Sequence, residues 1–162
     1  MTIHAYTGTY LCKPTKENPV MKGTYKTRWA DVDANGHLRH SAYADFCAHA
    51  RVEILEEMGL SVNKMREMAM GPILFREELV YKREVDLSEE IRIETFLAKA
   101  RKDASRWAIK HFMYKADNQL AAEVTVEGAW MNLRARKLGV LPETFAQRMN
   151  DMPKTDDFEW MD

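Results

Sequence analysis

The segment 31–40, DVDANGHLRH, holds the side chains of this chain that are best suited to chemistry. Four of its residues fall on the first, third, fifth and sixth positions of a calcium-binding loop: Asp31, Asp33, Asn35 and Gly36. Such a loop closes on a bidentate glutamate at its twelfth position, where this chain has Ala42, and its ninth position is the cation Arg39. A helix should enter a calcium loop, yet the preceding GTYKTRW is β-branched and aromatic. We therefore do not expect calcium here.

The same segment does not match a transition-metal site either. Asp31, Asp33, His37 and His40 are close in sequence, but their spacing fits no zinc pattern, so no metal is expected. Two readings of Asp33 stay open, a catalytic carboxylate and a turn, because aspartate commonly bonds its own backbone in Asx-turns. Asp31 is expected to be structural.

Composition narrows the class of protein. The 162 residues suffice for one domain with a core, and 46% apolar and 30% charged residues are typical of soluble globular proteins. A net charge of −1 gives no reason to expect nucleic acid or an anionic membrane as partner. Cys12 and Cys47 make no disulfide framework, and the chain has neither a long apolar run nor a signal-peptide pattern. We expect a cytoplasmic protein.

The segment around the aspartates reads as strand, loop and long helix. Residues 23–30 alternate, with Tyr25, Thr27 and Trp29 on one face, which predicts a half-buried strand. Ser41 is the expected N-cap of a helix that ends at Gly59. Its apolar stripe has 3.6-residue spacing: Tyr43, Phe46, Cys47, Ala50, Ile54, Leu55 and Met58. This helix must lie on a broad apolar surface.

Four strand candidates follow, at 73–84, 89–101, 104–116 and 119–134. They alternate between apolar and polar positions, and Trp107 and His111 are most simply read as alternating strand residues. We expect an antiparallel meander, with hairpins at ARKDAS and ADNQ and a short helix from Pro142. The predicted class is α+β, with one long helix against a five-stranded curved sheet. Residues 1–20 are expected to be an extension, 21–150 the domain and 151–162 a tail.

The element order and a local motif carry a resemblance to a known family. The motif runs through Asp31-Val32-Asp33, Gly36-His37, Tyr43 and Ala50-Arg51 to the stop at Gly59. Over residues 22–140 the chain resembles the hotdog-fold acyl-CoA thioesterases of the 4-hydroxybenzoyl-CoA thioesterase type. The resemblance implies a hotdog fold, hydrolysis of an acyl-CoA without a cofactor, and a homodimer, often assembled into a tetramer, with active sites at the seam between subunits.

Carried onto this sequence, the resemblance makes Asp33 the catalytic carboxylate, either as nucleophile or as general base. It places an oxyanion-binding backbone N–H at or next to His40, at the start of the long helix, where N–H groups lack partners. His37 could orient Asp33 or simply bond the loop backbone. The chain departs from many relatives in carrying Arg39-His40 where they have an asparagine pair, and Ala48 where they have a glutamate.

Residues for binding the substrate are less sharply indicated. Gly36 would let a pantetheine arm or acyl group pass close to the backbone, and Tyr43 could contact substrate or belong to the core. The phosphates of coenzyme A call for cations, for which Arg101 and Arg106 are candidates, beside Lys102 and the cluster Arg134, Arg136 and Lys137. Methionines near the helix end could fill the core or line an acyl tunnel.

Two other functions compete with hydrolysis. Enoyl-thioester hydratases of this fold use an aspartate with a histidine five residues later; from Asp33 that position is Leu38, so the register fails. A non-enzymatic protein that binds acyl-CoA, such as a sensor, stays possible because fold does not fix function.

Overall fold

A computed structural model describes residues 21–162; the predicted extension at 1–20 lies outside the described residues. The elements in chain order are β1 (Met21–Lys26), the 3-10 turn η1 (Trp29–Asp31), α1 (His40–Glu57), α2 (Val62–Glu67), β2 (Met70–Tyr81), β3 (Glu90–Ala100), β4 (Arg106–Tyr114), β5 (Leu120–Asn132), β6 (Lys137–Leu138), α3 (Glu143–Asn150) and β7 (Lys154–Trp160). None of the helices described is long and apolar enough to cross a membrane.

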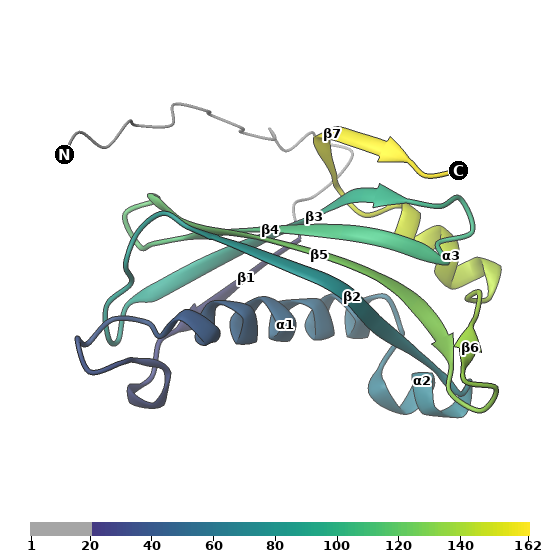
Figure 1. Cartoon of the computed structure of the whole chain (residues 1–162), viewed down its shortest axis with the longest axis horizontal. Coiled ribbons are helices and arrows are strands. Elements are labelled where there is room, and N and C mark those ends of the chain that lie inside the picture. Colours follow the sequence, from purple (N-terminus) through teal and green to yellow (C-terminus); the bar gives the residue numbers. More distant parts are fainter. Residues whose placement is uncertain (1–20) are drawn as a thin grey trace.

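The strands form one curved sheet, and α1 lies along its concave side (Figure 1). The main path runs β1-β3-β4-β5-β2 and is antiparallel throughout, while β6 adds to β5 and β7 to β3. The predicted α+β hotdog arrangement, with five main strands around one long helix, is therefore confirmed. β2 and β1 are the outer strands of this main path, so the backbone groups on the outer side of β2 have no strand partner within residues 21–162.

The core confirms the alternation read from the sequence. Ile91, Ile93, Thr95 and Leu97 of β3 are buried, as are Trp107, Ile109, His111 and Met113 of β4. On α1 the buried face consists of Ala42, Tyr43, Cys47, Ala50 and Ile54. Side chains of α1 thus pack against the inward positions of the middle strands, and this apolar contact is what holds the helix on the sheet.

The helix begins two residues earlier than predicted. It starts at His40 after Arg39, so Ser41 is not the N-cap; its hydroxyl instead accepts a hydrogen bond from the Arg39 guanidinium. The predicted stop is confirmed, because α1 ends at Glu57 and Gly59 adopts a φ of +80°.

Three other expectations are wrong. β2 does not join a meander with β3; it pairs with β5, because residues 82–89 cross the sheet from β2 at its edge to β3 beside β1 rather than making a hairpin. Trp29 does not face the core: the chain leaves the strand at Lys26 and turns in η1, which leaves its side chain 81% exposed. Residues 154–160, expected in a tail, form β7, which extends the sheet by parallel pairing with β3.

Candidate active site

The loop before α1 is folded around the Asp33 carboxylate. Its Oδ1 accepts the backbone N–H of Asn35 at 2.8 Å and that of His37 at 3.4 Å. The Asp33 N–H donates to the His37 carbonyl at 2.8 Å, and Gly36 completes the turn with a φ of +81°, which favours glycine. Asp33 is therefore a turn former, but only through Oδ1. No bond to Oδ2 is found within residues 21–162, and the side chain is exposed in the single chain.

A buried carboxylate anchors the beginning of the same loop. Asp31 accepts two hydrogen bonds of 2.9 Å from the Arg28 guanidinium and one of 2.9 Å from the Arg28 backbone N–H. Chiefly because of the hydrogen bond from the Arg28 side chain, the pKa of Asp31 is lowered from its ordinary value. The Asp31 carbonyl also accepts the N–H of Arg39. These bonds give Asp31 the structural role expected for it.

The far side of the loop is fastened to the connection between β2 and β3. Leu38 N–H donates to the Val85 carbonyl at 2.7 Å, and Leu87 N–H donates to the Gly36 carbonyl at 3.2 Å. The ring of His37 lies beside Glu84 and Asp86, with closest N–O distances of 3.9 and 3.7 Å. The ring of His37 thus faces these two carboxylates, while its backbone N–H and carbonyl form the hydrogen bonds with Asp33. No bond between its ring and the Asp33 carboxylate is found among the described residues.

The start of α1 supplies hydrogen-bond donors close to this loop. The Ala42 N–H bonds back to the Arg39 carbonyl at 2.9 Å. No acceptor is found in the described part of the chain for the N–H groups of His40 and Ser41, the first two residues of the helix. The side chain of His40 is exposed, while its carbonyl accepts from the hydroxyl of Tyr81 at 3.1 Å.

Tyr43 and the two arginines lie elsewhere. Tyr43 is buried, its hydroxyl donates to the Arg83 carbonyl at 3.2 Å, and burial raises its pKa, so it occupies a core position. Arg101 and Arg106 belong to the β3–β4 hairpin, which lies at the opposite end of the sheet from the loop before α1 (Figure 1). The Arg106 guanidinium lies 5.6 Å from the ring centre of Phe75 on β2. One chain therefore does not bring either arginine to Asp33.

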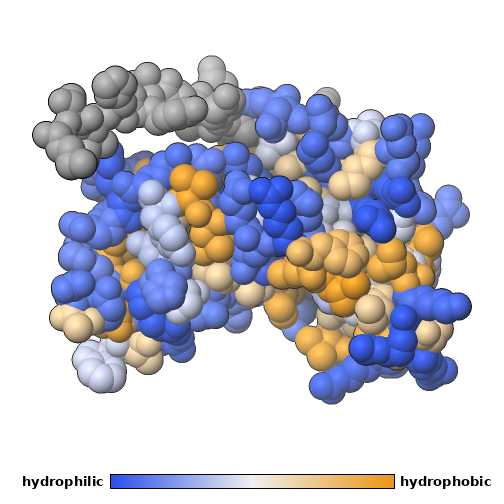
Figure 2. Space-filling view, in the orientation of Figure 1, coloured by the Kyte–Doolittle hydropathy of each residue, from blue (hydrophilic) through white to orange (hydrophobic). Residues whose placement is uncertain are grey.

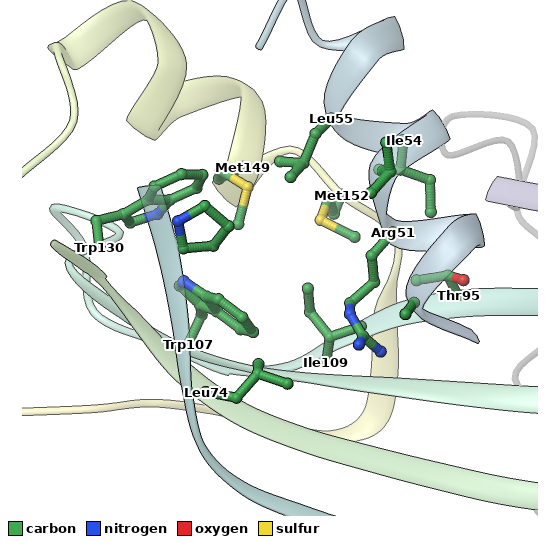
Figure 3. A pocket seen from close by; sticks show the side chains of 13 residues that line it. Arg51, Ile54, Leu55, Leu74, Thr95, Trp107, Ile109, Trp130, Met149 and Met152 are labelled. Carbon is green, nitrogen blue, oxygen red and sulfur yellow. The ribbon is translucent and has the colours of Figure 1, made fainter. Parts of the chain in front are cut away.

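The structure contains a cavity that the sequence did not reveal. About 200 Å³ of space lies between the second half of α1 and the sheet (Figure 3). Its walls are mostly apolar: Ala48, Val52, Ile54 and Leu55 of α1, Pro72 and Leu74 of β2, Trp107, Ile109 and Trp130 of the middle strands, and Met149 and Met152 at and after the end of α3. Val52 and Leu74 are partly exposed, which places the mouth of the cavity beside the free edge of β2.

One cation lines this apolar cavity. Arg51 projects from α1 toward the sheet near Thr95 and Ile109 (Figure 3), and its guanidinium lies 3.0 Å from Nε2 of His111. Nδ1 of His111 lies 2.8 Å from the Thr95 hydroxyl. The sequence did hold a signal for Arg51, since a charged residue four positions after Cys47 falls beside the apolar stripe of the helix.

A family model described as the thioesterase-like superfamily matches residues 27–149 of this chain. The chain belongs to that superfamily. The matched range includes the loop, α1 and the cavity walls up to Met149, so the features described above lie almost wholly within the family domain.

Individual relatives agree with this assignment. The acyl-acyl carrier protein thioesterase ATL3 of Arabidopsis thaliana, a chloroplastic protein, is 32% identical over 97 residues, which cover 58% of this chain and 48% of the plant protein. The chain thus matches about half the length of that curated relative.

Solved structures show the same fold. The hypothetical protein SAV2348 of Staphylococcus aureus, solved in complex with CoA, is similar with a TM-score of 0.79 at 17% identity, over 88% of this chain and 91% of that one. The 1,4-dihydroxy-2-naphthoyl-CoA thioesterase Slr0204 of Synechocystis has a TM-score of 0.73 at 17% identity, over 82% of this chain and 97% of that one.

Within residues 21–162, no three His, Cys, Asp or Glu side chains are placed to hold a metal ion.

Proposed function

We propose that this protein hydrolyses an acyl-CoA thioester, with Asp33 as the catalytic carboxylate and the N–H groups of His40 or Ser41 as donors to the oxyanion. The observation that carries the proposal is the geometry of the loop. Oδ1 of Asp33 accepts from backbone N–H groups, while Oδ2 has no partner within residues 21–162. The loop that carries Asp33 leads directly into α1, whose first two N–H groups have no acceptor in the same described part of the chain. A carboxylate and unused N–H groups are what thioester hydrolysis requires.

The chemistry consumes one water. In one route Oδ2 of Asp33 attacks the thioester carbonyl, the C–S bond breaks, and water then hydrolyses the resulting anhydride. In the other, Asp33 removes a proton from water, which attacks the same carbon. Both routes end with the hydroxyl of water on the acyl carbon and a proton on the sulfur of coenzyme A. Backbone N–H groups at the start of α1 stabilise the negative oxygen formed in either case.

The exposure of Asp33 in one chain is consistent with a site completed by a second copy. β2 is an outer strand with several exposed apolar side chains: Leu74, Phe75, Val80 and Tyr81. Figure 2 shows apolar surface gathered on the part of this face where β2, β5 and α2 lie in Figure 1. An unpaired strand edge carrying apolar side chains favours pairing with another strand.

Antiparallel pairing of two β2 strands about their middle would bring the separate parts together. Residues 72–74, at the cavity mouth, would then lie opposite residues 77–79 of the other copy, and Tyr81 of that copy would follow just after them. Tyr81 bonds the His40 carbonyl, so the start of α1 would accompany it across the seam. The acyl group would enter the cavity of one subunit while the Asp33 of the other acts on the carbonyl, and Arg101 and Arg106 would approach that site to meet the CoA phosphates.

The test is release of free thiol from a panel of short, aromatic and long acyl-CoAs. We expect turnover of at least one substrate, and a fall in kcat of about 100-fold or more for Asp33→Asn. Asparagine keeps an oxygen that can accept from Asn35 and His37, so the turn survives while the charge is lost. Asp157→Asn, which changes an exposed carboxylate of β7, is the matched control and should retain wild-type rates.

Other results would point to other functions. Binding of acyl-CoA without thiol release would favour a sensor, and loss of the enoyl absorbance without thiol release would favour a hydratase. Hydrolysis by Asp33→Asn at the wild-type rate would remove Asp33 from the mechanism.

A further inference from the structure

The cavity beside α1 has a marked chemical bias, since its polar groups are mostly donors. The indole N–H groups of Trp107 and Trp130 are buried and have no acceptor among the described residues, and both residues line the cavity. The guanidinium of Arg51 has only N–H donors. The Thr95 hydroxyl, which could accept, is already bonded to His111. A buried donor without an acceptor is costly, so a cavity lined by the guanidinium of Arg51 favours a ligand that brings an acceptor.

The groups around Arg51 hold it in place, and some of its N–H donors have no acceptor among residues 21–162. Its Nη1 donates to Nε2 of His111, so the proton of the imidazole is on Nδ1, which donates to the Thr95 hydroxyl. Burial lowers the pKa of His111 well below its ordinary value, which keeps the ring neutral. On the other side, Nη2 of Arg51 lies 3.9 Å from Glu77, beyond a short hydrogen bond. The guanidinium is therefore oriented by its partners without being saturated by them.

The charge of the site favours a neutral acceptor over a carboxylate. Glu77 already lies beside Arg51 and offsets its charge. The Arg51 side chain is largely buried, with 12% exposed, while 31% of the Glu77 side chain is exposed. A second carboxylate would lose its hydration in a mostly apolar cavity and meet Glu77. A carbonyl or hydroxyl oxygen can accept from Arg51 without this cost.

The size of the cavity limits the ligand. An apolar cavity of about 150 Å³ accommodates benzene, so about 200 Å³ has room for one substituted six-membered ring or a short branched chain. A long straight acyl chain does not fit unless the walls move.

We propose that Arg51, oriented by His111 and Thr95, determines substrate specificity by binding a neutral oxygen on a short or single-ring acyl group seated in this cavity. This proposal rests on the proposed hydrolysis of acyl-CoA for its function, but the binding site itself can be tested without turnover. His111 and Thr95 are positioning residues in this account, and only Arg51 contacts the acyl group.

Binding is tested with two pairs of small probes that differ in one oxygen: 4-ethylphenol against 4-ethyltoluene, and acetophenone against cumene. Fluorescence of Trp107 and Trp130 reports binding once the exposed Trp29 and Trp160 are replaced by phenylalanine. We expect the oxygen-bearing member of at least one pair to bind about tenfold more tightly. Arg51→Met should remove that preference while keeping affinity for the hydrocarbon.

Arg92→Met is the matched control. Arg92 lies on β3 one residue from the buried Ile91 and Ile93, on the opposite face of the sheet from α1, and pairs with Glu94. The variant Arg92→Met should keep the preference of the wild type for the oxygen-bearing probes. Equal affinity within both pairs, a preference that survives Arg51→Met, or no binding of any probe would overturn the proposal.

A second arm separates this proposal from the proposed function. Thiol release is compared for hexanoyl-, 3-oxohexanoyl- and 5-oxohexanoyl-CoA, and for phenylacetyl- against 4-hydroxyphenylacetyl-CoA. We expect kcat/KM to favour an oxygen-bearing member about tenfold, and Arg51→Met to abolish this ratio. Hydrolysis with no such ratio overturns the specificity role of Arg51 and leaves the function standing. If the oxygen-bearing probes bind in a way that depends on Arg51 but no thiol is released, the proposed hydrolysis is overturned and the proposed binding site still stands.

Discussion

The guanidinium of Arg51 lies 3.0 Å from Nε2 of His111, and the two side chains form the main polar contact between the long helix and the middle of the sheet beside the cavity. His111 is completely buried. A cation next to a buried imidazole disfavours a proton on that imidazole, so the contact requires a neutral ring. The pair therefore links the stability of the fold to pH as well as lining the cavity.

We predict that the protein loses stability as the pH falls below the ordinary histidine range. Burial, and secondarily the charge of Arg51, lower the pKa of His111 in the folded state. Below a pH of about 6.5 the unfolded chain therefore binds a proton that the folded chain rejects. The free energy of unfolding should fall by up to about 1.4 kcal/mol per pH unit between pH 6.5 and 5 from this group alone. Urea unfolding at several pH values measures the slope.

The variant His111→Gln separates this effect from other titrations. Glutamine can still accept from Arg51 but does not titrate, so the slope between pH 6.5 and 5 should be smaller than in the wild type. His49→Gln, on the exposed side of α1, leaves the buried ring in place and should keep the wild-type slope. An unchanged slope in His111→Gln would contradict the assignment.

We predict that Asp31 matters for stability and Asp33 for turnover. Asp31→Asn weakens the bonds from Arg28 that fix the start of the loop, which should lower the free energy of unfolding by about 1–2 kcal/mol at pH 7. Because its folded pKa is lowered, this contribution is present above the ordinary aspartate range and is lost as the pH falls through the folded pKa. Thermal melts of Asp31→Asn and Asp33→Asn should separate the two roles, with the larger shift in Asp31→Asn.

The local parts of the fold could be predicted because they follow from local periodicity. The stripe from Tyr43 to Met58 predicted α1 to within two residues at its start. The alternation of β3, β4 and β5 predicted the side chains that face α1, while Phe96, Ala108 and Phe112 on the other face are buried as well. The hairpins that join these strands are also local. Each of these features depends on residues close together in the chain.

Features that depend on distant partners could not be predicted in the same way. Nothing in residues 70–81 indicates that β2 pairs with β5 rather than β3, and β7 is a strand because β3 offers it an edge. The cavity appears only when α1, β2 and the end of α3 meet. The two interpretations of Asp33 are compatible with each other, because one oxygen makes the turn and the other has no partner within residues 21–162.

We predict that β2 mediates the formation of a dimer and that the dimer is needed for activity. Phe75 is 56% exposed on this outer strand, and Phe75→Glu would place a charge in the proposed seam. The variant should be monomeric by light scattering, remain folded by circular dichroism, and lose most thiol-releasing activity. Trp160→Glu, which changes an exposed aromatic residue of β7, should keep the wild-type mass and activity. A wild-type protein that is active as a monomer would contradict the shared site.

We predict that the thiol of Cys47 does not react with thiol reagents while the protein is folded. Burial among the side chains of the core raises the pKa of its thiol to about 12, so at pH 8 it is protonated as well as inaccessible. In a Cys12→Ser background, which removes the other cysteine, a thiol reagent should label the native protein at a negligible rate and label one group per chain in denaturant. The labelling rate as a function of denaturant then measures opening of the contact between α1 and the sheet. Fast labelling under native conditions would show that this contact opens readily, and with it the wall of the cavity that holds Arg51.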